Sequence, residues 1–124
     1  MPAKRLSGKR AYPVKAGAVL TGNRPVLLAA GLAIAVTDNN SALSAGVATM
    51  LADNANGADS AIMVEVDTGE HKFVSADITI DDVGSDAYFV DDLNVSIDSD
   101  TDGRAKAGKI TQVDSDGVWV ELGV

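Results

Sequence analysis

Aspartate dominates the acidic residues of this chain, and this bias constrains the fold more than any other feature. Of the 18 acidic residues, 15 are Asp and 3 are Glu. Asp favours turns and caps because its short carboxylate accepts hydrogen bonds from nearby backbone N–H groups. Together with 12 Gly and many Val residues, the bias predicts short strands joined by tight turns.

Short apolar segments separated by turn residues recur along most of the chain. The clearest is 61–67, where Ile62, Val64 and Val66 alternate with Met63 and Glu65, as on the two faces of a strand. Thr79 and Asp82 have the spacing of a capping pair, which predicts one helical turn near 79–83. Strands are expected at 18–20, 25–30, 32–37, 46–52, 61–67, 71–74, 86–90, 94–97, 108–113 and 118–122.

Turn residues predict how these strands pair. Hairpins are expected within 61–74, 86–97 and 108–122. In the last, the turn at 114–117 is expected to hold Gly117 at positive φ, with Val118, Val120 and Leu122 facing the core and Trp119 facing away. The predicted fold is mainly β: a small barrel or sandwich of short antiparallel strands, with one short helix and an extended N-terminal arm.

Charge divides the chain into two parts. Residues 1–24 carry six cations and no acid, whereas residues 25–124 carry all 18 acids and four cations, so a segment of +6 precedes a body of −14. Such asymmetry is typical of an arm that engages a partner, although a solubilising terminus has the same pattern. We expect an arm at 1–16 and a β-rich domain at 17–124.

The residue types exclude several classes of function. The chain has no Cys and a single His, His71, and its glycines do not have the spacing of a phosphate-binding loop. The Asp pairs at 81–82 and 91–92 lie at expected turns, where acid–base catalysis is not favoured. We therefore expect no enzyme and no cofactor. A net charge of −8 argues against nucleic acid as a partner, and the longest apolar stretch, 26–36, is too short to span a membrane.

One acidic loop leaves a second function open. Residues 98–103 read D-S-D-T-D-G, like the start of an EF-hand loop, but position 12 of that loop would be Lys109 instead of a bidentate Glu. A solvated turn is the simpler interpretation. The alternative hypothesis is a calcium-dependent β-rich binding or adhesion module.

The last third of the chain resembles a known family. Residues 82–92 (D-V-G-S-D-A-Y-F-V-D-D), 104–108 (R-A-K-A-G) and 113–122 (V-D-S-D-G-V-W-V-E-L) resemble tailed-phage capsid cement, or head decoration, proteins. The likeness extends over about 46–122 and includes D-N-A-N-G-A-D at 53–59. Ala87 stands where many relatives have Cys, and residues 105–106 are less Arg-rich than in the family.

This resemblance implies a non-catalytic structural protein of the virion. It would bind the major capsid protein on the outer surface of the head as a homotrimer and stabilise the shell, after synthesis in the host cytoplasm. Trp119, the single Trp, faces away from the core side of its strand, so it either covers a second small core or lies at a subunit interface, where Trp is enriched; we favour the interface. The candidate capsid contacts are the cations of the arm: Lys4, Arg5, Lys9, Arg10 and Lys15.

Overall fold

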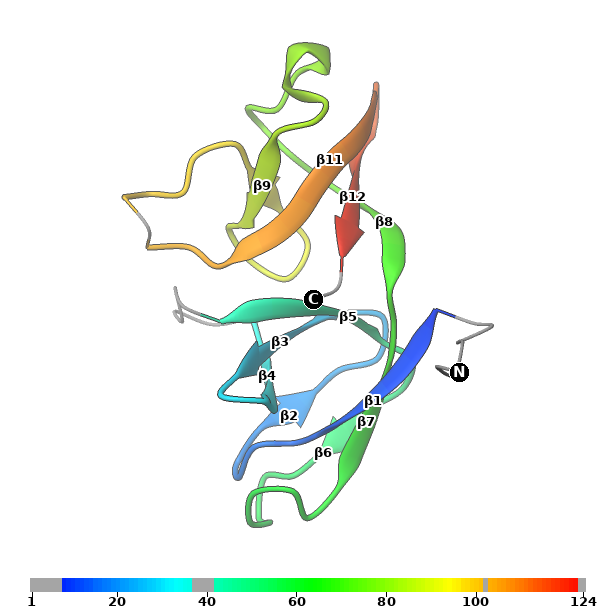
Figure 1. The fold of residues 1–124 in the computed structure, drawn as a ribbon, viewed down its shortest axis with the longest axis vertical. Coiled ribbons are helices and arrows are strands. Elements are labelled where there is room, and N and C mark those ends of the chain that lie inside the picture. The colour runs from blue at the N-terminus through cyan, green and yellow to red at the C-terminus, as the bar shows by residue number, and fades with distance from the viewer. Residues whose placement is uncertain (1–7, 37–41, 102, 123–124) are drawn as a thin grey trace, which may run out of the picture.

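The computed structural model describes residues 8–36, 42–101 and 103–122, which form a mainly β fold of short strands (Figure 1). The strands are β1 (Lys9–Pro13), β2 (Val19–Leu20), β3 (Pro25–Ala29), β4 (Leu32–Ala35), β5 (Leu43–Ala48), β6 (Ala52–Asp53), β7 (Met63–Asp67), β8 (Gly69–Phe73), β9 (Asp86–Phe89), β10 (Val95–Ser96), β11 (Lys106–Asp114) and β12 (Gly117–Leu122). The 3-10 turn η1 (Ile80–Asp82) lies between β8 and β9. The strands do not close into a barrel, so the barrel form of the prediction is wrong.

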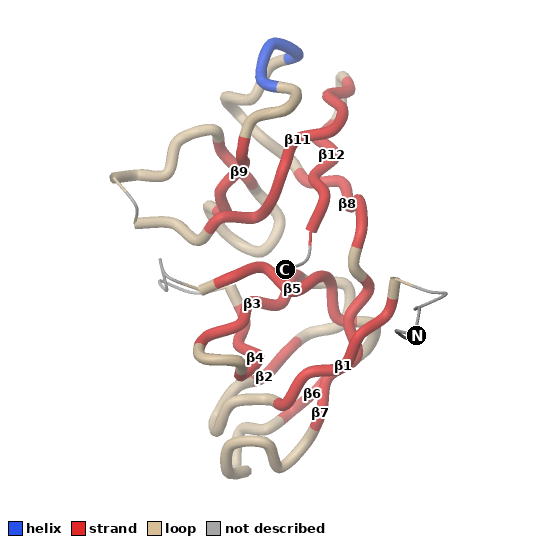
Figure 2. The backbone as a smooth tube through the Cα atoms, in the orientation of Figure 1, coloured by secondary structure: helices blue, strands red, loops and turns tan. Residues whose placement is uncertain are grey.

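The chain is arranged as two halves that follow each other in sequence (Figure 2). Strands β1 to β7 form the first half, and the second holds β9 to β12 with η1; β8 leads from one to the other. One sheet runs through both, with the path β1-β7-β5-β11-β12-β8, while β2 and β6 pair separately. The halves meet where β5 and β11 pair in parallel at Leu43 and Lys106, and where the buried Ser44 hydroxyl donates to the Ala107 carbonyl over 2.6 Å.

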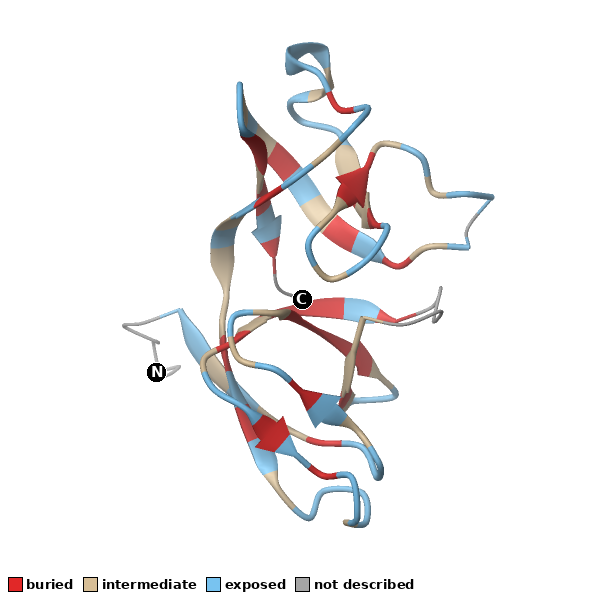
Figure 3. Ribbon diagram, turned by 180° about the vertical axis from the view of Figure 1, so that it is seen from behind, coloured by how far each residue is buried: buried red, intermediate tan, exposed pale blue. Residues whose placement is uncertain are grey.

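Two apolar clusters form the core, and buried residues occur in both halves of the molecule (Figure 3). The first lies within residues 14–66 and includes Val14, Leu20 and Val66. The second contains mainly residues of the second half, among them Phe73 and Phe89, whose rings meet edge to face at 5.7 Å. Leu27 and Ala42 of the first half also belong to this second cluster. The two halves therefore share apolar surface and do not pack as independent units.

Where one face of a strand is buried, the alternation of apolar and polar residues predicts that strand correctly. In β7, Val64 and Val66 are buried while Met63 and Glu65 are exposed, as predicted. In β12, Val118, Val120 and Leu122 are buried and Trp119 is not, which confirms the predicted orientation. The helical turn is also confirmed, because the Thr79 backbone N–H donates to Asp82 Oδ2 over 2.8 Å at the start of η1.

Two of the three predicted hairpins form. β9 pairs with β10, and β11 with β12, but β7 and β8 do not pair with each other. Instead, β7 lies between β1 and β5, and β8 pairs with β12. The Thr68 hydroxyl and backbone N–H both donate to the Gly8 carbonyl, and Gly69 follows at φ 91°. The turn at 68–69 therefore carries the chain from one half to the other.

Gly117 has a different role from the one predicted. It is absent from the residues with positive φ. A Cβ at this position would lie 2.8 Å from the Phe73 carbonyl oxygen and 2.8 Å from Lys72 Cε. Glycine is needed because β8 passes close to the backbone of β12, and no left-handed turn is involved.

The predicted arm is too long at its C-terminal end. Residues 9–13 form β1 in register with β7, and Val14 is fully buried, so residues 9–14 belong to the sheet. Lys9 lies directly opposite Asp67, and an edge strand tolerates such cations because their long side chains reach solvent. Residues 1–7 lie outside the described part of the chain.

Candidate functional site

The candidate cations divide among different surroundings. Lys9 Nζ forms an ion pair with Asp67 Oδ1 at 2.9 Å, and this hydrogen bond raises the pKa of Lys9. Arg10 is the next residue of the strand, so its side chain leaves the opposite face. Lys15 is exposed just beyond β1. The described cations therefore do not form one basic patch, and Lys4 and Arg5 lie outside the described residues.

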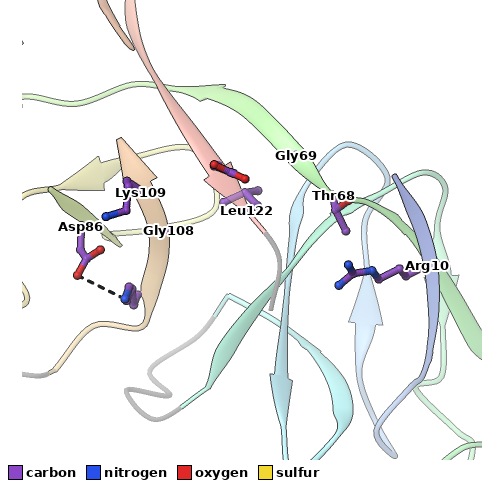
Figure 4. A pocket seen from close by; sticks show the side chains of 9 residues that line it. Arg10, Thr68, Gly69, Asp86, Gly108, Lys109 and Leu122 are labelled. Atoms are coloured by element: carbon purple, nitrogen blue, oxygen red, sulfur yellow. Dashed lines mark ion pairs between the residues drawn. The ribbon is translucent and has the colours of Figure 1, made fainter. Parts of the chain in front are cut away.

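Arg10 lines a polar cleft between the two halves, with a cavity volume of about 460 Å³ (Figure 4). Lys106 and Lys109 approach it from β11, together with Asp86 and Glu121. Lys106 is 3.4 Å from Asp86, and Lys109 Nζ donates to the Gly84 carbonyl over 3.3 Å. Charges of both signs line the cleft, which suits polar contact with a partner surface more than binding of one small ion.

Trp119 lies on the outer face of β12 in a polar network that we call the Trp119 cluster. Its indole N–H donates to Asp114 Oδ2 over 2.9 Å, and Lys72 Nζ is 5.8 Å from the ring centroid. Lys72 also pairs with Asp116 at 2.6 Å and lies 3.7 Å from Asp114. The ring is half-buried, so the cluster holds it in place while leaving part of it open to solvent.

Hydrogen bonds set the charge states in this cluster. Bonds from Gln112 and Trp119, with Lys72 nearby, lower the pKa of Asp114. The bond between Lys72 and Asp116 lowers the pKa of Asp116 and raises that of Lys72. Both carboxylates and the ammonium group are therefore charged at neutral pH.

A shallow apolar groove in the first half was not predicted as a site. Met50 and Leu51 approach it from the loop after β5, and Met63 and Glu65 from β7, around a volume of about 360 Å³. We call this the Met63 groove. Alternation in 61–67 predicts that Met63 points outward, but the predicted strand at 46–52 gave no sign that Met50 and Leu51 lie beyond its end.

The acidic turns act on their own backbone. Asp98 Oδ1 accepts from the Asp100 N–H, and the Asp98 carbonyl accepts from Arg104. Asp91 accepts from the backbone N–H groups of Leu93 and Asn94 and from the Asn94 side chain, and hydrogen bonds from both residues lower its pKa. No group of three metal-ligating side chains gathers among the described residues, which leave out Asp102 of the 98–103 loop.

His71 lies on β8, opposite Val120 of β12. It is half-buried, and its Nδ1 is buried without a hydrogen-bond partner in the described structure.

Comparison with known proteins adds no relative. No protein-family model, no curated protein and no solved structure matches the chain. Within the described ranges, no helix has the length and apolar character needed to cross a membrane.

Proposed function

We propose that this chain is a structural virion protein, which binds the outer surface of a phage capsid and stabilises the head shell without catalysis. The observation that carries the proposal is the sequence pattern over 46–122, which resembles capsid cement proteins. Its last three motifs fall on β9 with the segments on either side of it, on the start of β11, and on the β11–β12 hairpin, which are neighbours in one half of the molecule. These three motifs therefore lie in the second half, whereas the motif at 53–59 lies in the first.

Surface features support a docking role. The chain presents the Met63 groove, the half-buried Trp119 and a basic N-terminal segment on an otherwise acidic body. Surfaces of both signs restrict the orientation in which a partner binds, which suits a protein that adds to a regular lattice.

Binding to capsids tests the proposal directly. Capsids of the phage that carries the gene, prepared without this chain, are mixed with the purified protein, and bound copies per capsid are counted. We expect saturable binding that raises the temperature at which the heads open. Removal of residues 2–7, which include Lys4 and Arg5, is expected to weaken capsid binding. Because the contact is partly ionic, the difference in affinity between the truncated and the intact chain should be larger at low salt. An absence of saturable binding by the intact chain would refute the function.

We further propose that the bound form is a homotrimer with Trp119 at the subunit interface. Three copies around a three-fold site multiply weak contacts through effective concentration, and cyclic symmetry is the usual solution for identical chains. Trp119→Ala is expected to lower capsid occupancy by a larger fraction than it lowers the free energy of unfolding of the isolated chain. A cryo-EM map of decorated heads with single, isolated copies would contradict the trimer.

A further inference from the structure

A group of exposed apolar side chains lines the Met63 groove. Of the ten large apolar residues that are exposed in the described chain, three line this one hollow: Met50, Leu51 and Met63, at 68%, 62% and 57% exposure. Scattered apolar residues on a surface need no explanation, but a group around a concavity is typical of an interaction site. Met side chains suit such sites because they adapt to the shape of a partner.

The strand pairing leaves the groove open. Met63 lies opposite Pro13 of β1, and Glu65 lies opposite Ala11. Neither Pro13 nor Ala11 has a side chain long enough to cover Met63. Neighbouring apolar residues on the inner face, such as Val64, are already buried in the first cluster, so the exposed face of β7 is not needed for folding.

The rim of the groove is acidic and ordered. Thr49 donates its backbone N–H to the Glu65 carbonyl over 3.0 Å, and its hydroxyl lies 3.2 Å from Glu65 Oε1. These bonds hold the carboxylate beside Met63. Asp53 is the second acid on the rim, and the groove lining contains no Lys, Arg or His. The groove is thus complementary to an apolar side chain flanked by basic residues.

We propose that the Met63 groove binds the major capsid protein through an exposed apolar side chain of that protein flanked by Lys or Arg. This inference rests on the proposed function and names a contact within it. The acidic body of a second copy is a poor occupant, because it carries −14 and would bring like charge to an acidic rim; binding of a second copy through its basic N-terminal segment is distinguished by the mass measurement below. The basic N-terminal segment would then contact acidic groups of the capsid, and the acidic groove would contact basic ones.

The test compares two double variants on capsids that lack the chain. Leu51→Ser with Met63→Ser removes the apolar lining, and we expect capsid affinity to fall by roughly tenfold or more, as when central interface side chains are removed. Ile80→Ser with Val83→Ser is the matched control, because both residues are also exposed but lie at η1, and its affinity should stay within about twofold of the parent. Circular dichroism and melting temperature confirm that both variants fold.

A charge variant tests the second part of the proposal. Glu65→Lys should weaken capsid binding, and Glu65→Gln should weaken it less, because only Lys repels a basic flank. Equal binding by the parent and the groove variant would overturn the inference while leaving the function standing. Failure of the parent to bind capsids would overturn both. A groove variant whose mass in solution falls relative to the parent would assign the groove to self-association and overturn the capsid contact.

Discussion

The side chain of Asn54 ties the loop before β7 to the end of β1. It is buried, and its Nδ2 lies within 3.2 Å of the carbonyl oxygens of Val14, Lys15 and Ala58. Each of these carbonyls also accepts a backbone N–H, from Ser60, Ala18 and Ala61 respectively, so the Asn54 amide adds a second donor that links the two segments. The sequence predicts a polar loop at 53–59, but nothing in it distinguishes Asn54 from its exposed neighbour Asn56.

Replacing Asn54 should destabilise the fold. Asn54→Ala removes three side-chain hydrogen bonds worth about 1 kcal/mol each, and we expect a loss of roughly 2–3 kcal/mol in the free energy of unfolding, measured by urea denaturation. Asn54→Asp keeps the shape but has no N–H to donate, so it should be at least as harmful. Asn56→Ala is the control and should lie within about 0.5 kcal/mol of the parent. A fully stable Asn54→Asp variant would contradict the assigned donor role.

A second prediction at this scale concerns Gly117. Because its φ is not positive, the cost of a side chain comes from the close backbone of β8. Gly117→Ala should therefore lower the free energy of unfolding by roughly 1–3 kcal/mol, as overpacking does. Ser115→Ala, in the same turn and exposed, should be nearly neutral. Equal stability of the two variants would show that β8 moves aside at no cost.

At the scale of elements, the Trp119 cluster joins β8 to the β11–β12 hairpin through charge. The pKa of Asp114 and that of Asp116 are lowered in the folded chain. Their contribution to stability is therefore complete above the pKa of an unfolded Asp, about 3.9, and is lost as the pH falls through the folded values. Lys72, whose pKa is raised, contributes below about 10.4 and loses its contribution as the pH rises through its folded value.

This linkage predicts a measurable pH dependence. Urea midpoints should fall between pH 5 and pH 3, and Asp114→Asn should flatten this dependence because the variant keeps the shape but cannot be protonated. Asp81→Asn removes a charge from exposed η1 and serves as the control. A slope that is identical in Asp114→Asn and in the parent would show that the cluster does not couple to folding.

Elements with one buried face could be predicted from sequence, and their distant partners could not. Alternation identified 61–67, and the turn at 114–117 identified the last hairpin. β1 falls within the predicted arm because cations occupy the start of this edge strand. The pairing of 61–67 with 71–74 was wrong because local turn residues carry no information about β1, β5 and β12. The Met63 groove arises from the same distant pairing, so only Met63 could be predicted to point outward.

At the scale of the whole molecule, the N-terminal boundary decides which truncations are informative. Removal of residues 2–7 leaves β1 intact and should preserve the far-UV spectrum and the melting temperature. Removal of residues 2–14 deletes an edge strand and the fully buried Val14, so it should destabilise the chain by several kcal/mol, in line with about 2–3 kcal/mol per buried apolar side chain. Equal melting temperatures for both truncations would show that β1 is not part of the stable sheet.

The second cluster contains residues from both halves of the chain, and this affects the order of folding during synthesis on the ribosome. The first cluster lies entirely within residues 14–66, so its members have all been synthesised before most of the second half leaves the ribosome. The second cluster requires Leu27 and Ala42 beside residues as late as Leu122. Since domains fold progressively from the N-terminus during translation, the first half can collapse early and act as a template, against which β11 and β12 dock last. Pairing across such long sequence separations is slow, so docking of β11 and β12 is expected to be the last step of folding.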